Sequence, residues 1–164
     1  MKPRVTIFLQ VVIVLIAVAA LAMMIRLPMT EGRAKNLDWV NIYLDPFILY
    51  GYAASIALFI GMYKAFKLLG HIRQNQAFSP PSVNALKSIE QCAIVFSILI
   101  IVAGIYTRIF HAKDDDPAGF LAICMVIVFL SMIVAAAAEV FKATLQQGLD
   151  LKSENEILNQ QLKK

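Results

Sequence analysis

Long apolar stretches alternate with short polar connections along this chain. Four stretches contain no Asp, Glu, Lys or Arg: Val5 to Ile25, Pro46 to Tyr63, Gln91 to Thr107 and Pro117 to Ala138. A helix needs roughly 20 residues, each rising about 1.5 Å, to cross about 30 Å of hydrocarbon. The two shorter stretches end beside Lys64 and Arg108, whose apolar stems lie along a helix while the charge reaches the headgroups. The pattern predicts four transmembrane helices, at about 5–25, 46–66, 91–109 and 117–139.

The stretches are continuously apolar, without the alternation of a barrel strand, so they indicate an all-α integral membrane protein. The first stretch has a positive start and an Ala20-Leu21-Ala22 segment that resembles a signal-peptide cleavage site. A signal peptide usually has an apolar region of only about 7–15 residues. We therefore interpret 5–25 as a retained first span.

The connection between the second and third spans carries signals for a new helix. Ser79 is a natural N-cap, Pro80 suits the first helical position, and Phe78 has the spacing to pack on Val83 as a hydrophobic staple. Pro81 allows the cap to shift by one residue. A stripe of apolar residues then leads into the third span: Val83, Leu86, Ile89 and Ala93. We interpret this segment as architecture, with docking of a partner as the alternative.

The C-terminal tail, residues 140–164, is charged, lacks proline and is rich in helix-forming residues. It predicts a cytoplasmic helical extension of the last span. Its apolar stripe is imperfect and too short to establish a coiled coil on pattern alone. Binding to a partner helix and folding back on the protein's own helices both remain open.

Orientation follows from the distribution of Lys and Arg. With both termini and the middle connection on one side, that side holds ten basic residues and the other side five. The positive-inside rule places the ten in the cytoplasm, which gives an N-in/C-in topology. The chain has 164 residues, 60% of them apolar and 16% charged, and a net charge of +4. Because the basic residues flank the spans, they indicate contact with the lipid bilayer and no direct binding of nucleic acid.

Candidate chemistry is sparse. Asp114 to Asp116 and His111 could suggest a metal site, but Asp116 as a helix cap and Pro117 at the first helical position explain the segment better. His71 is interpreted as a solvated side chain. The uncharged spans hold no strongly ionisable group of the kind that marks proton relays. We therefore predict no catalytic residue, no cofactor and no metal.

Small residues recur within the second span, where Ala53, Ala57 and Gly61 form a row at four-residue spacing. Such rows let helix backbones approach closely in membranes, so these three residues are predicted to mediate helix packing. Cys92 and Cys124 show no redox or metal spacing and are interpreted as small apolar residues.

Several segments resemble a known family. They are the run from Gly61 to Leu69, the segment from Asn75 to Ser79, the run from Ala85 to Ile89, the acidic turn from Lys113 to Gly119, and the closing motif from Asp150 to Glu156. Together they resemble the YoaS-like bacterial four-span membrane proteins, the domain of unknown function 2975 family. The family usually ends in a short Leu-Thr-hydrophobic finish, whereas this chain continues as Ile157-Leu158-Asn159-Gln160-Gln161.

The resemblance implies a multi-pass protein of the bacterial cytoplasmic membrane without assigned catalytic residues. It also implies, by gene neighbourhood in the family, a membrane partner for a small helix-turn-helix regulator. The candidate residues for structural or partner contacts are Phe78, Ser79, Pro80, Asp116, Pro117, Glu154, Asn155 and Glu156.

The leading hypothesis is thus a non-enzymatic membrane protein that acts through protein contacts with a cytoplasmic regulator. The alternative is a homo-oligomeric channel or small-molecule carrier whose path lies between subunits.

Overall fold

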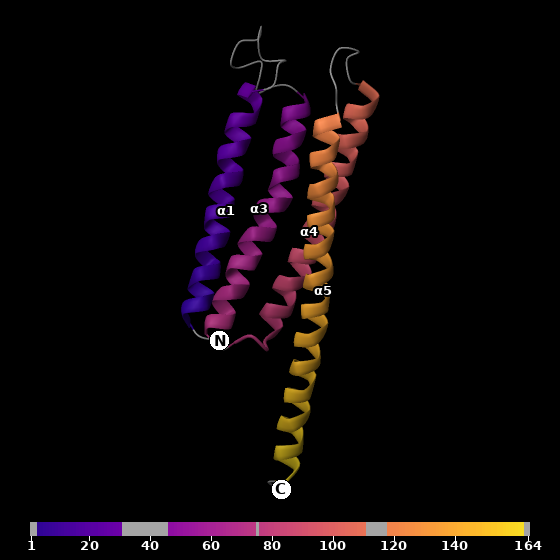
Figure 1. Cartoon of the computed structure of the whole chain (residues 1–164). Helices are drawn as coiled ribbons and strands as arrows, with labels where there is room; N and C mark the ends of the chain where they lie inside the picture. The colour runs from indigo at the N-terminus through magenta and orange to yellow at the C-terminus, as the bar shows by residue number, and fades with distance from the viewer. Residues whose placement is uncertain (1–2, 31–45, 75, 111–117, 163–164) are drawn as a thin grey trace.

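The computed structural model consists of long helices and describes residues 3–30, 46–74, 76–110 and 118–162. Helix α1 spans Pro3–Thr30, α3 spans Pro46–Arg73, α4 spans Pro80–Phe110 and α5 spans Ala118–Gln161 (Figure 1). Each helix contains the described part of one predicted span and is long and apolar enough to cross a membrane. The all-α prediction with four candidate spans is confirmed, since the described part of the chain contains no strand. Asp116 and Pro117 lie outside the described residues.

Helices α4 and α5 continue well beyond their apolar segments. α4 begins at Pro80, as the turn signals predicted, and runs unbroken into the third apolar stretch. α5 has 44 residues, which corresponds to about 66 Å of helix. The tail is therefore helical as predicted, as far as Gln161, and continuous with the last span.

The helices are arranged in a row that follows the chain order. α1 packs on α3, α3 on α4, and α4 on α5, so that α1 and α5 form the two edges (Figure 1). The start of α1, the α3–α4 connection and the end of α5 all lie at the same end of the molecule (Figure 1). We call this the tail end, because α5 projects from it past the other helices.

The contact between α4 and α5 follows a heptad-like register. Along α5, buried or half-buried residues recur at alternating spacings of three and four, at Cys124, Val128, Ser131, Ala135, Ala138, Lys142, Leu145 and Leu149. This spacing favours the shallow left-handed crossing of coiled coils and most membrane helix pairs. On α4, a Cβ built at Gly104 would lie 3.6 Å from a methyl carbon of Leu121 and 3.9 Å from the Cβ of Cys124. Small residues thus allow the two backbones to approach closely.

Side-chain hydroxyls join neighbouring helices within the apolar region. Ser131 of α5 and Ser97 of α4 both donate to the carbonyl oxygen of Ala93, each at 2.9 Å. Tyr50 of α3 donates to the carbonyl of Leu99 at 2.7 Å. These bonds satisfy hydroxyls that have no water to bond within a hydrocarbon environment.

The outward faces of the helices are strongly apolar. Large hydrophobic side chains are exposed along all four, among them Ile16, Ile56, Ile98 and Phe129. A soluble monomer rarely leaves so continuous an apolar surface in water. The surface is suited to lipid chains, and the small buried core reflects that environment.

Candidate functional site

Residues 76–79 of the α3–α4 connection, at the tail end, are held by a set of hydrogen bonds. The amide of Ser82 donates to the carbonyl oxygen of Ser79 at 3.0 Å, and the amide of Val83 donates to the same oxygen at 3.3 Å. Ser79 is therefore the cap residue whose carbonyl accepts the first bonds of α4. Its hydroxyl donates to the carbonyl of Gln76 at 2.7 Å.

Ser82 is the second anchor of this connection. Its side chain is fully buried, at 0% exposure, and its hydroxyl donates to the carbonyl of Gln76 at 3.1 Å. The hydroxyl oxygens of Ser79 and Ser82 are also 3.1 Å apart. No sequence signal singled out Ser82, because a serine after two prolines is usually a solvated turn residue. The two serines together fix the backbone on which Phe78 is presented.

Phe78 connects this segment to α5. A Cβ built at Gly148 would lie 2.5 and 2.6 Å from two carbons of the Phe78 ring, so the ring rests directly on the glycine. The sequence predicted Val83 as the staple partner of Phe78, and that pairing stays a prediction; the ring also contacts a residue far along the chain. Because Gly148 has no side chain, the Phe78 ring can pack directly against the backbone of α5 there.

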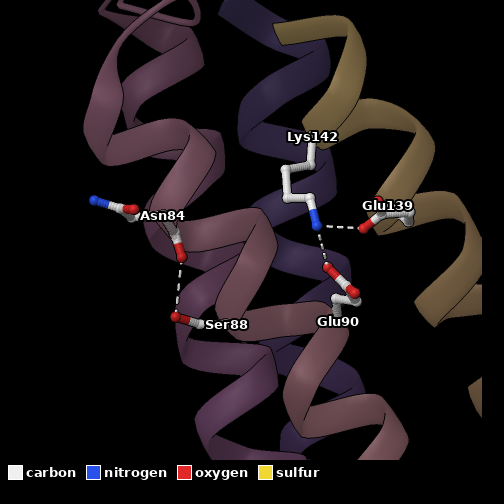
Figure 2. A network of polar contacts seen from close by, with 5 residues as sticks. All are labelled: Asn84, Ser88, Glu90, Glu139 and Lys142. Carbon is white, nitrogen blue, oxygen red and sulfur yellow. Dashed lines mark hydrogen bonds and ion pairs between the residues drawn. The ribbon is translucent and has the colours of Figure 1, made fainter. Parts of the chain in front are cut away.

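An ion-pair cluster joins α4 to α5 at the same end (Figure 2). The Nζ of Lys142 lies 2.8 Å from a carboxylate oxygen of Glu90, and both side chains are 21% exposed. Lys142 also bonds to Glu139, one turn earlier on α5. Lys142 lies beyond the predicted span 117–139, and its bonds to Glu139 and then to Glu90 raise the pKa of the ammonium. One cation therefore bridges two carboxylates and fixes the rotation of α5 against α4.

Polar groups also lie between α1 and α3 near the tail end. The amide nitrogen of Gln10 donates to the carbonyl of Phe66 at 3.4 Å. His71 is half-buried, and its Nδ1 has no hydrogen-bond partner among the described residues. The sequence-based interpretation of His71 as a solvated side chain therefore does not describe this ring nitrogen, which is shielded from solvent.

The other predicted residues are distributed as follows. Glu154, Asn155 and Glu156 are exposed on the projecting part of α5. Gly61 faces α4, where a Cβ built on it would lie 3.4 Å from the Cβ of Cys92, while Ala57 is half-buried and Ala53 is exposed. Within the described ranges, no group of three His, Cys, Asp or Glu is placed to hold a metal ion.

A groove lies at the opposite end, between α3 and α4. Its volume is about 170 Å³, and its lining residues are Pro46, Phe47, Tyr50, Val102, Ala103 and Tyr106. The rings of Phe47 and Tyr106 are stacked with centroids 6.0 Å apart. The lining is mainly apolar, which suits a hydrophobic occupant and supplies no acid–base pair.

Comparison with known proteins agrees with this architecture. The family model described as "Protein of unknown function (DUF2975)" matches residues 29–157. The chain is 38% identical to the "Uncharacterized membrane protein YoaS" of Bacillus subtilis (strain 168) over 154 residues, which is 93% of this chain and 96% of that protein. No solved structure matches the chain. This membrane protein therefore belongs to the DUF2975 family, whose function is unknown.

Proposed function

We propose that the protein is a non-enzymatic component of the bacterial inner membrane that binds a soluble cytoplasmic regulator of the helix-turn-helix class. The main observation in support is the set of contacts at the tail end, where the Phe78 ring packs on Gly148 and Lys142 joins α4 to α5. A connection that served only to reverse the chain would not need two serine anchors and a seated aromatic ring. These contacts give a fixed surface outside the apolar segments, as recognition of a protein partner requires.

The charge distribution supports a cytoplasmic tail end. Among the described basic residues, two lie toward the opposite end, Arg26 and Arg108, and seven lie toward the tail end: Arg4, Lys64, Lys67, Arg73, Lys87, Lys142 and Lys152. This is the bias that the positive-inside rule associates with the cytoplasmic face. A partner at this end would therefore be a cytoplasmic protein.

Affinity purification from native membranes tests this proposal. Two variants alter the tail end around this surface while leaving the apolar segments intact: truncation after Leu149, and Arg73→Gln combined with Lys87→Gln at two exposed positions. Arg26→Gln at the opposite end is the matched control. We expect the wild type and the control to retain a DNA-binding protein, the two variants to lose it, and transcripts under that protein to change only in the two variants. An unchanged partner and unchanged transcripts in both variants would refute the proposal, as would the lack of any retained DNA-binding protein.

A homo-oligomeric carrier is the second candidate, favoured by the open groove between α3 and α4. Its stacked aromatic lining suits an apolar solute, and a neighbouring copy would complete the wall of such a path. Purified protein in liposomes should then exchange hydrophobic solutes faster than empty liposomes. Equal exchange rates would exclude this candidate.

A further inference from the structure

The projecting part of α5 carries a narrow apolar stripe. Leu151, Asn155, Leu158 and Leu162 follow one another at spacings of four, three and four residues. The helix continues through this segment, and the amide of Leu162 still donates to the carbonyl of Leu158 at 3.0 Å. All four residues therefore lie along one face of α5. In heptad terms, Leu151 and Leu158 occupy d positions, and Asn155 and Leu162 occupy a positions.

This stripe is distinct from the seam that binds α4. The seam runs through Lys142, Leu145 and Leu149, whereas every described residue from Asp150 onward is exposed. Leu151 is 62% exposed, Leu158 50% and Leu162 83%. Gly148 is the a position that precedes Leu151 in the same heptad register, and the ring of Phe78 covers it. The free stripe therefore begins at Leu151.

The chemistry around the stripe favours a helix over a lipid surface as its occupant. The stripe is only one a/d seam wide, whereas a helix that lies on a membrane has a broad apolar face flanked by basic residues. Between Asp150 and Leu162 the side chains include three acids, Asp150, Glu154 and Glu156, and a single base, Lys152. With Lys163 and Lys164, residues 150–164 hold three acids and three bases, so they lack the excess of basic residues that binds anionic lipid headgroups.

We propose that the stripe pairs with the same stripe of a second copy of this chain, as a short parallel coiled coil in register. A single Asn at an a position among Leu residues at d is the pattern that specifies a parallel pair, because two asparagines facing each other bond to one another and a slipped register would bury them unpaired. The flanking g-to-e′ neighbours would be Gln147 with Lys152 and Glu154 with Asn159, so no like charges meet. The stripe is therefore complementary to itself.

Anchoring in the membrane compensates for the short length of the pair. Fewer than two heptads are too short to pair stably between free peptides in water. Two copies in one membrane, however, project their tails in the same direction, which permits the parallel arrangement. Confinement to the membrane also raises their effective concentration. This inference does not depend on the proposed regulator, since it concerns contact between copies alone.

Cysteine cross-linking in native membranes tests the pairing. Asn155→Cys and Leu158→Cys lie on the stripe, whereas the control variants Ser153→Cys and Gln160→Cys lie on the opposite face of the same helix. A disulfide requires Cα atoms within about 7 Å, so mild oxidation should convert the stripe variants to dimers on the order of tenfold more than the controls. The parent chain, which retains Cys92 and Cys124, gives the background.

Charge substitution provides a second measurement. Leu151→Glu together with Leu162→Glu should abolish the Asn155→Cys cross-link, while Ser153→Glu together with Gln160→Glu should leave it in place. Equal cross-linking on both faces of the helix, or none on either face, would overturn the proposal. Cross-linking of Asn155→Cys to a different protein in place of a second copy would also overturn it. If the full-length protein retained no regulator in the affinity experiment, the cross-link pattern of the full-length cysteine variants would be unchanged, so the two proposals fail independently.

Discussion

The contact between the Phe78 ring and Gly148 gives a prediction about local stability. Whether Gly148→Ala stabilises or destabilises α5 should depend on the presence of Phe78. Gly148→Ala should normally stabilise α5, because alanine is favoured over glycine in a helix interior by about 1 kcal/mol. Here, however, the new Cβ would lie 2.5 Å from a carbon of the Phe78 ring, so the ring must move away. The serine bonds at Ser79 and Ser82 hold the backbone of the connection, so the ring cannot follow by moving the whole segment.

The magnitude follows from the area that the ring covers. Phe78 is 52% exposed, so about half of a side chain that buries roughly 200 Å² when fully covered is in contact with protein. At about 25 cal/mol per Å², that contact is worth up to about 2.5 kcal/mol. Losing most of it outweighs the propensity gain of about 1 kcal/mol. With Phe78 present, we expect Gly148→Ala to lower the free energy of local opening of α5 near Gly148 by about 1 kcal/mol.

Hydrogen exchange of the α5 amides near Gly148, measured by mass spectrometry in bicelles, reports local opening of this segment. Gly148→Ala should speed exchange by roughly fivefold when Phe78 is present. In a Phe78→Ala background, the same substitution should slow exchange by a similar factor, because only the helix propensity remains. If Gly148→Ala slowed exchange in both backgrounds, the contact between the Phe78 ring and Gly148 would be refuted.

Two further predictions concern the helix contacts. Gly61→Leu should lower the free energy of unfolding by about 1–3 kcal/mol, because a Cβ at this position would lie 3.4 Å from the Cβ of Cys92. A Cβ at Gly51 has nothing within 4 Å, so Gly51→Leu should be neutral in the same thermal unfolding assay. Lys142→Met leaves two carboxylates facing each other without their shared cation and should lower the melting temperature in detergent, whereas Lys152→Met on the projecting helix should not; equal melting temperatures for the two variants would contradict the bridging role.

The elements were predictable because each depends on local sequence. A continuous apolar run of the right length is sufficient to predict a membrane helix, and the Ser79-Pro80 pair indicated where α4 begins. The helical tail followed equally from local propensity, since residues 140–161 lack proline and favour a helix.

The order of the helices in a row was not predictable in the same way. Apolar side chains face both lipid and neighbouring helices in a membrane protein, so hydrophobicity does not distinguish a packed face from a lipid-facing one. The tail-end contacts were missed for a related reason. Glu90 and Lys142 are 52 residues apart, and neither helical period nor motif spacing connects them. Such contacts become visible only when α4 and α5 are placed side by side.

The central claim is that the end bearing the α3–α4 connection and the projecting α5 faces the cytoplasm, where a regulator can reach it. Labelling of Ser153→Cys with a membrane-impermeant thiol reagent tests this most directly, with the parent chain as background. Intact spheroplasts should show no labelling above that background, and permeabilised spheroplasts should be labelled fully. Labelling in intact spheroplasts would place the tail outside the cell and contradict the account.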